Sequence, residues 1–244
     1  MKKIAFLLAF ILCLGAAAGF AAELKPANVV GTWYSNTATG SYGEVVLLDP
    51  VQLDLNRDGS MTLTYKDETI QGTWSLSGDK ESVHVKAESG DVLFIEQDEE
   101  GGLWINIKMF KGQFSSIYLN CALSREVTPF SCGEPVAAEE EDAFYGTWKA
   151  AYRIYDEMPG VLVVLPEDTA ALTVEFAQAT MEEADQDPVT VMTNFTDGKL
   201  VSPDGDSLTL TDKDMMIVID ARDLLIEAVY DTYVFVRVAE EAAE

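Results

Sequence analysis

Short apolar runs separated by turn residues recur along most of the chain. In residues 103–109 every odd position is apolar and the even positions are mixed, a period of two that is typical of a strand with one buried face. At Asn56-Arg57-Asp58-Gly59, an Asp-Gly pair supplies the positive φ that a tight hairpin requires. Turn signals recur about every eight to twelve residues, and this spacing indicates an all-β sandwich or barrel.

Each half of the chain contains about eight such runs. The run Met215–Ile219 is apolar on both faces, which predicts that the second half buries part of its outer surface. In the first half, strands are predicted around Trp33 and over 52–55, 61–65, 70–76, 82–86, 92–96, 103–110 and 117–123. In the second half, they are predicted over 147–155, 171–177, 189–194, 199–201, 207–211, 215–219, 224–230 and 233–238.

The two halves begin and end alike. Each opens with Gly-Thr-Trp, which ends in Trp33 in the first half and in Trp148 in the second. An arginine closes the last apolar run of each half, because Arg125 follows Trp33 by 92 positions and Arg237 follows Trp148 by 89. Two segments of matching length and matching ends predict a duplicated structural unit.

The segment between the two predicted units differs from them in composition. The units are predicted over residues 22–126 and 143–239, and an acidic linker over 127–142 separates them. The linker contains helix- and strand-breaking prolines and a run of four acidic residues, which repel one another and favour exposure to solvent. Residues 240–244 form an acidic tail of the same kind.

The N-terminus has the features of an export signal. Lys2 and Lys3 precede an apolar run over residues 4–14, and small residues then lead to Ala21. Residues 1–21 are therefore predicted to be a secretory signal peptide cleaved near Ala21, and the mature protein to be secreted into the extracellular space. This run is too short for a membrane span, and we expect no span in the mature chain.

The charge balance excludes several classes of partner. The chain carries 16 basic and 42 acidic residues, a net charge of −26. Removal of residues 1–21 leaves 14 basic residues, so the mature charge is 14 − 42 = −28. Such a charge repels nucleic acid and disfavours anionic membranes. It is consistent with solubility outside the cell, or with weak attraction of divalent cations or basic partners.

Two cysteines remain after removal of the signal peptide. Cys121 lies in the last strand of the first unit, and Cys132 lies eleven positions later in the linker. In an exported protein they are predicted to form a disulfide that holds the linker against the first unit. Closing so short a loop would stabilise the fold by about 2–3 kcal/mol. Two free thiols are the alternative.

The residues needed for catalysis are scarce. The chain has one histidine, His84, which is predicted to lie on the polar face of a strand. A serine triad needs a histidine oriented by a carboxylate, and a transition-metal cage needs more histidines and cysteines than this chain has. Paired carboxylates carry no weight among 42 acids. We therefore expect no enzyme activity, no catalytic residues, no cofactor and no metal site.

Calcium is the one metal ion for which the sequence offers candidate ligands. Asp54, Asn56 and Asp58 have the spacing of the front half of a calcium loop, but loop position twelve is Tyr65 rather than the glutamate of an EF-hand. The pattern favours a hairpin turn over a calcium site. The alternative is a group of loop carboxylates made of Asp204, Asp206, Asp212 and Asp214.

A Gly-x-Trp on the first strand with a late arginine resembles the calycin superfamily, which includes the lipocalins and avidins. The stretch Leu53-x-Leu55-Asn56-x-Asp58-Gly59-Ser60, followed by Gly72-Thr73-Trp74, is also similar to the lipocalin-like domains of bacterial secreted proteins. The resemblance implies two small up-and-down β-barrels in tandem, each of about eight strands. It also implies that Trp33 with Arg125, and Trp148 with Arg237, are the pairs that seal the closed ends of the barrels, a structural role.

The resemblance implies a binding function. We expect a non-enzymatic protein that holds a small apolar or amphipathic ligand in a barrel mouth, lined by Tyr65, Trp74, Trp104 and Tyr118. Core packing is the competing role for these aromatic residues. The alternative function is an extracellular structural or protein-interaction module that uses the apolar strands of the second unit, and either function could depend on calcium. A single sheet shared by both halves would contradict the picture of two separate barrels.

Overall fold

The computed structural model describes residues 24–41, 43–88, 92–97, 102–111, 116–127, 129–155, 160–184, 186–203, 205–219 and 232–239. The predicted signal peptide, the acidic tail and the predicted strand over 224–230 lie outside these residues. Within the described residues, no helix has the length and hydropathy of a membrane span.

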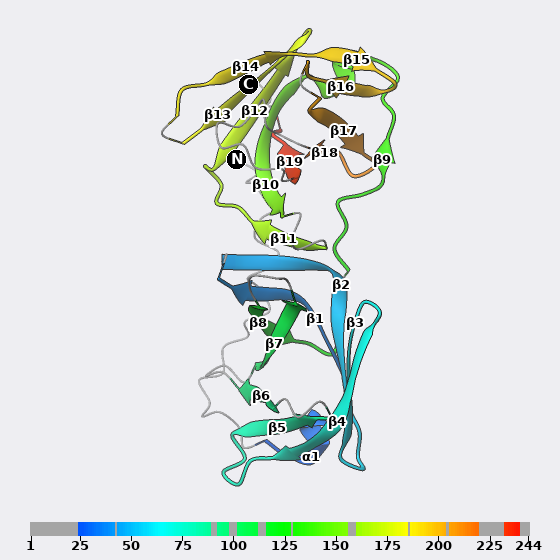
Figure 1. The fold of residues 1–244 in the computed structure, drawn as a ribbon, viewed down its shortest axis with the longest axis vertical. Coiled ribbons are helices and arrows are strands. Elements are labelled where there is room, and N and C mark those ends of the chain that lie inside the picture. The colour runs from blue at the N-terminus through cyan, green and yellow to red at the C-terminus, as the bar shows by residue number, and fades with distance from the viewer. Residues whose placement is uncertain are drawn as a thin grey trace, which may run out of the picture.

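Eight antiparallel strands of the first unit form a closed barrel (Figure 1). Each strand pairs with the next along the chain, and β8 pairs back with β1 through Ala38↔Cys121 and Thr39↔Asn120. The predictions of an all-β fold and of one up-and-down barrel are confirmed. The strands are β1 (Gly31–Gly40), β2 (Gly43–Leu55), β3 (Ser60–Tyr65), β4 (Glu68–Leu76), β5 (Ser82–Ala87), β6 (Val92–Gln97), β7 (Leu103–Lys111) and β8 (Ser116–Leu123).

Alternation of apolar and polar residues fills the interior of this barrel. In β2, Val51, Leu53 and Leu55 are buried, while Gln52 and Asp54 between them remain partly exposed. The same alternation holds in β3 and β5, as expected for a small barrel that is filled by its own side chains. Further interior residues are Met61, Leu63, Val83, Val85, Ile95, Leu103, Ile105, Ile107, Leu119 and Leu123.

Eleven further strands pack outside the barrel. They are β9 (Pro135–Val136), β10 (Gly146–Ile154), β11 (Val161–Val164), β12 (Ala170–Glu175), β13 (Gln178–Glu183), β14 (Val189–Met192), β15 (Asn194–Thr196), β16 (Lys199–Val201), β17 (Ser207–Thr211), β18 (Met215–Ile219) and β19 (Thr232–Arg237). Two short helices precede β1 and β10, namely α1 (Pro26–Val29) and the 3₁₀ helix η1 (Glu141–Phe144).

The second unit surrounds a core of its own but is not shown to close. Its ladders run from β14 through β13, β12, β10, β19, β18, β17 and β16 to β15. Thr193 alone separates β14 from β15 along the chain, and no ladder joins these two strands within the described residues. Trp148, Phe144 and Phe235 are the largest buried side chains of this second core.

Strand β11 connects the two units. One edge of β11 pairs with β2, where Leu162 lies opposite Val46, and the other edge pairs with the end of β10. Val161 and Val163 contribute to the core of the first barrel, whereas Leu162 faces the opposite side of the sheet. In Figure 1, β11 and the adjacent part of β2 lie side by side between the two units.

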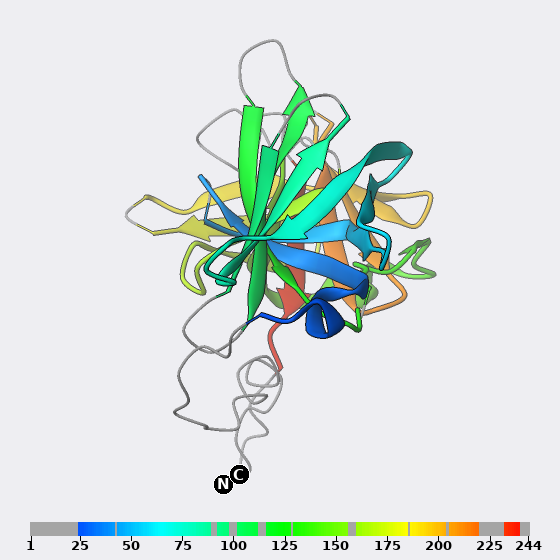
Figure 2. The same cartoon turned by 90° about the horizontal axis from the view of Figure 1, so that it is seen from below.

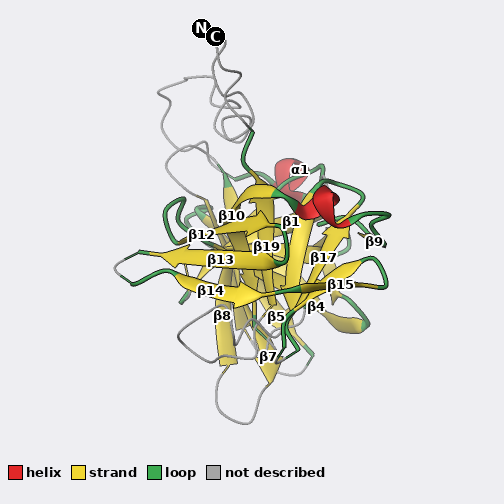
Figure 3. Ribbon diagram, turned by 90° about the horizontal axis from the view of Figure 1, so that it is seen from above, coloured by secondary structure: helices red, strands yellow, loops and turns green. Residues whose placement is uncertain are grey.

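The ends of the two units that carry the short helices α1 and η1 lie on the same side of the molecule. Figure 3 shows both short helices on one side. Figure 2 shows α1 and the C-terminal end of β19 on that same side. Since the antiparallel pairing of β2 with β11 joins the second strand of each unit, the two halves approach each other through equivalent parts of the chain.

The prediction of two separate barrels is therefore right only in part. One barrel is closed, a second closed barrel is not shown, and all nineteen strands belong to one hydrogen-bonded sheet. The physical reason lies in residues 45–48 and 161–164, which are apolar at every position and are buried or partly buried on both faces. A strand of this kind is stable only when it is covered on both sides.

We expect Leu162→Ala to destabilise the whole chain rather than one unit, because Leu162 is fully buried where the units meet. The loss should be about 2–5 kcal/mol in the free energy of unfolding, as for other large-to-small core substitutions. Urea denaturation followed by circular dichroism would measure it. Val136→Ala, at a residue 38% exposed, is the matched control and should change stability by no more than about 0.5 kcal/mol. Loss of structure in only one unit would contradict this expectation.

Candidate functional site

An arginine stacked on a tryptophan caps one end of the barrel. The Arg125 guanidinium carbon lies 3.5 Å from the centroid of the Trp33 ring. Arg125 Nη2 donates hydrogen bonds to the carbonyl oxygens of Asn28 at 2.7 Å and Val30 at 3.1 Å. The Trp33 indole N–H donates to the carbonyl oxygen of Val29 at 2.7 Å. The arginine thus satisfies carbonyl groups that the end of α1 leaves unpaired.

The second unit has the same cap. The Arg237 guanidinium carbon lies 3.9 Å from the Trp148 ring centroid. Arg237 donates to the carbonyl oxygens of Ala143 at 2.8 Å and Tyr145 at 2.9 Å. The Trp148 indole N–H donates to the carbonyl oxygen of Phe144 at 2.9 Å. A cation over an aromatic face contributes about 0.5–2 kcal/mol, more when it is desolvated.

The two caps use equivalent atoms. In both, the indole donates to the carbonyl four residues before it, and the guanidinium donates to the carbonyls three and five residues before the tryptophan. Gly31 and Gly146 have φ values of +121° and +118°. A Cβ at Gly31 would lie 2.6 Å from Arg125 Nη1, so this position requires glycine. Neither of the two pockets described below is lined by a tryptophan or arginine of a cap.

Two of the aromatic residues predicted to line a mouth face the barrel core, but at opposite ends of one hairpin. Tyr65 ends β3 and packs against the core, and burial raises its pKa to about 12. Trp74 lies near the far end of β4, where its indole N–H donates to the carbonyl oxygen of Asn56 at 2.8 Å. They therefore cannot contact one ligand together.

The other two aromatic residues do not complete a mouth either. Trp104 lies between Leu103 and Ile105, which both face the core, so strand alternation places its side chain on the outer surface of the barrel. The side chain of Tyr118 lies outside the described residues. The three described members of the predicted aromatic set are thus not brought together, because the register of the strands separates them.

A pocket of about 370 Å³ lies instead at the junction of the two units. One wall is the outer surface of the sheet, and the other is the linker between the units. We call it the junction pocket. Its sheet wall consists of Leu48, Ile154, Ile217 and Val234, and its linker wall of Phe130, Ser131, Cys132, Gly133 and Glu134.

The apolar wall of the junction pocket follows from strands that are apolar on both faces. In β2, Val45 and Leu47 face the barrel core, so Val46 and Leu48 face the junction. In β18, Met216 and Val218 face the second core, so Met215 and Ile217 face outward. The predicted burial of the outer surface of the second unit is confirmed for this region, which the linker and the first unit cover.

The linker is fixed in place by hydrogen bonds to the turn between β17 and β18. The backbone N–H of Glu134 donates to Asp212 Oδ1 at 3.0 Å, and the N–H of Asp212 donates to the Glu134 carbonyl at 3.0 Å. Lys213 Nζ donates to the carbonyl oxygen of Ser131 at 3.1 Å. Phe130 packs on Tyr152 with ring centroids 5.0 Å apart. Residues 130–134 of the predicted linker, which precede its acidic run, therefore form one wall of a site.

The predicted disulfide is absent, and this prediction is corrected. Cys121 and Cys132 are both free and buried. Cys121 faces the core of the first barrel, whereas Cys132 packs with Leu162 and Val234 on the other side of the sheet. Because the wall of the barrel separates them, the thiols cannot bond. Burial raises the pKa of both thiols, that of Cys121 to about 12.

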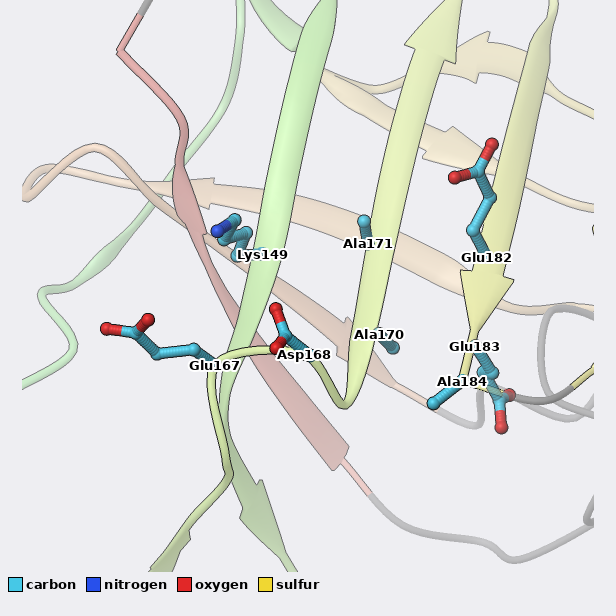
Figure 4. Close-up of a pocket in the computed structure, with 8 residues that line it drawn as sticks. All are labelled: Lys149, Glu167, Asp168, Ala170, Ala171, Glu182, Glu183 and Ala184. Atoms are coloured by element: carbon cyan, nitrogen blue, oxygen red, sulfur yellow. The ribbon is translucent and has the colours of Figure 1, made fainter.

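A second pocket, of about 250 Å³, lies on the outer surface of β10, β12 and β13. Figure 4 shows Lys149 and Asp168 among the lining residues, while the carboxylates of Glu167, Glu182 and Glu183 point in different directions. Oxygen ligands must converge to hold a cation. Within the described residues, no group of three or more His, Cys, Asp or Glu side chains could hold a metal ion.

The acidic residues considered for calcium have other partners. Asp54 accepts a hydrogen bond from the Thr32 hydroxyl at 2.6 Å. Asp58 accepts from the N–H and hydroxyl of Ser60, and these bonds lower its pKa. Asp214 pairs with Arg237 at 3.0 Å. Of the remaining loop acids, Asp206 is buried, Asp212 holds the linker, and Asp204 lies outside the described residues.

The single histidine lies where the sequence predicts it. His84 is exposed on the outer surface of β5, and its ring packs edge-on against Phe94 at a centroid distance of 5.1 Å. It contributes to neither pocket.

Comparisons with known proteins give no family. No protein-family model matches the chain, and no curated protein matches it. Among solved structures, it is similar to a protein of unknown function from the DUF3598 family of Nostoc punctiforme. That match has 10% sequence identity and a TM-score of 0.25, and it covers 87% of this chain and 97% of the other. A likeness of this size carries no argument about function.

We expect Arg237→Met to destabilise the protein by about 2–4 kcal/mol, because it removes the contact with Trp148 and leaves two carbonyl oxygens without their charged donor. Thermal or urea unfolding would measure the loss. Arg57→Met, in an exposed hairpin turn, is the control and should change stability by about 0.5 kcal/mol or less. Equal effects of the two substitutions would contradict a capping role for Arg237.

We expect Cys121 and Cys132 to be alkylated without prior reduction once the protein is unfolded. In the native protein at pH 8, alkylation of both should be slow, because burial raises the pKa of each thiol and keeps it protonated. Iodoacetamide labelling followed by peptide mass spectrometry would measure both states. A requirement for reductant before either cysteine reacts would show that the disulfide forms after all.

Proposed function

We propose that this protein is a non-enzymatic binding protein that holds a small apolar or amphipathic ligand in the junction pocket. The observation that carries the proposal is the pocket itself. Its volume of about 370 Å³ falls within the range of about 300–1,000 Å³ that is typical of small-molecule sites. Its walls are mainly apolar, and they are held on both sides by ordered structure.

The interior of the first barrel supports this location over a barrel mouth. Side chains from all eight strands fill the interior, and neither of the two pockets described lies inside it. A ligand would have to displace close-packed core residues to enter there. At the junction, by contrast, an apolar ligand would replace water along Leu48, Ile154, Ile217 and Val234.

The polar groups of the linker wall favour an amphipathic ligand. Ser131 and Glu134 line the same side of the pocket as Phe130. A ligand could place its apolar part against the sheet and a hydroxyl or amine at these residues. A carboxylate headgroup is disfavoured there, since Glu134 and the net charge of −26 would repel it.

The proposal includes the origin and location of the protein. The two equivalent caps support a duplicated lipocalin-like unit, of which the second copy, residues 143–239, is a barrel that stays open beside β14. Residues 1–21 have the sequence of a signal peptide, which supports secretion. Such a protein would carry its ligand outside the cell without modifying it.

Binding of the uncharged dye Nile red would test the proposal. We expect its fluorescence to rise when it binds, and Ile217→Trp to fill the pocket and weaken binding at least tenfold. Ile219→Trp is the matched control, because Ile219 lies two residues further on the same strand, is 45% exposed and does not line the pocket. Binding by the control variant should match that of the unmodified protein.

Two results would contradict the proposal. Nile red could fail to bind the unmodified protein, or it could bind the Ile217→Trp variant as tightly as the control. The melting temperatures of both variants should be measured and should match that of the unmodified protein, so that loss of fold is not mistaken for loss of the pocket. Native mass spectrometry of protein purified from its own host would then identify a bound molecule.

A further inference from the structure

Among the residues that the structure describes, no strand covers one edge of β14. It pairs with β13 over its whole length, from Met181↔Val189 to Gln178↔Met192. The chain then continues into β15, which pairs with β16 instead. Within the described residues no ladder involves the other edge of β14, and in Figure 3 this strand runs along the surface of the second unit.

The backbone groups on this edge point away from β13. The N–H of Thr193, directly after β14, donates to the carbonyl oxygen of Ala177 at 2.9 Å. Since N–H groups alternate between the two edges along a strand, those of Thr190 and Met192 point toward the uncovered edge. An incoming strand would find donors and acceptors there in the geometry of a sheet.

Large apolar side chains lie exposed beside this edge. Met192 is 59% exposed, and Phe176, in the turn between β12 and β13, is 77% exposed. Met192 lies opposite Gln178, and Phe176 lies in the turn two residues before Gln178. No other large apolar side chains among the described residues are as exposed as these two. Exposed apolar residues of this kind mark interaction sites.

The sequence of β14 lacks the features that usually protect an edge strand. Val-Thr-Val-Met carries no charge and has a high preference for the extended conformation. Soluble proteins commonly protect such edges with lysines, prolines or bulges. Here Pro188 precedes the strand, but nothing within β14 prevents the addition of another strand.

The negative charge around this edge of β14 favours a positively charged partner. Glu175, Glu182 and Asp187 are exposed around β13 and β14, and the chain as a whole carries a net charge of −26. This charge attracts a cationic segment and opposes pairing of β14 with the same strand of a second copy.

We propose that β14 binds an extended, lysine- or arginine-rich segment of another protein by β-strand addition. The backbone of that segment pairs with Thr190 and Met192, its apolar side chains contact Met192 and Phe176, and its basic side chains lie near the surrounding carboxylates. This mode of recognition takes its affinity from main-chain hydrogen bonds and its specificity from alternate side chains. The site is distinct from the junction pocket.

Fluorescence anisotropy with a labelled nine-residue peptide of alternating valine and lysine would test the proposal. We expect the full chain to bind this peptide at least tenfold more tightly than a matched peptide with glutamate in place of lysine. Met192→Pro removes the outward N–H and should weaken binding at least tenfold. Met192→Ala keeps the N–H but removes the side chain, and should weaken binding about threefold.

Ile219→Ala is the matched control, since it removes an exposed apolar side chain from β18 and should leave peptide binding unchanged. Amide hydrogen exchange of the unmodified protein gives a readout that is independent of folding defects in the variants. The lysine peptide should slow exchange at Thr190 and Met192. Equal binding of the two peptides, full binding by Met192→Pro, or unchanged exchange at these amides would overturn the proposal. A dimer of the unmodified protein in sedimentation, together with a monomer of the Met192→Pro variant, would also overturn it, because β14 would then pair with a second copy.

Discussion

The architecture depends on the pairing of β11 with β2. These strands come from different units, and each is apolar at every position where they meet. Their inward residues, among them Val45, Val161 and Val163, complete the core of the first barrel. The outward residues Val46 and Leu162 form the floor of the junction between the units. Because exposure of either face would cost the free energy of apolar hydration, the two units must stay together.

The two units carry caps of the same construction. In each, a guanidinium covers an indole and takes up carbonyl oxygens at the same offsets from the tryptophan. The second strand of each unit then pairs with that of the other, so residues in equivalent places face each other, as in a symmetric dimer. The linker covers the groove that remains on the outside and turns it into a pocket.

Local features of the fold could be predicted from the sequence, whereas the contacts between the units could not. Alternation over residues 103–109 correctly predicts a strand, and the repeated Gly-Thr-Trp marks the start of both units. Strand β13 was missed because Phe176 and Ala177 form its turn, with φ of +54° at Ala177 and no glycine or asparagine to signal it. The apolar runs at 45–48 and 161–164 were not predicted as strands, although β2 includes the first and β11 is the second, and the sequence does not show which strands cover them.

The candidate site, like the fold, could be predicted from the sequence only in part. Tyr65, Trp74 and Trp104, which are predicted to line one barrel mouth, are separated by the register of the strands, which sequence alone does not fix. The linker residues Phe130 and Cys132 were not expected in a binding site, because prolines and acidic residues surround them. The uncovered edge of β14 likewise depends on pairings between strands that are distant in the chain.

Amide hydrogen exchange of the full chain tests the central claim most directly, because it reports the stability of single backbone hydrogen bonds. The pairing of β11 with β2 predicts that the amides of residues 45–47 and 161–163 exchange as slowly as those in the centre of β10. Exchange at 161–163 as fast as in the hairpin turn at 56–59 would show that β11 is not part of a shared sheet, and would contradict this account.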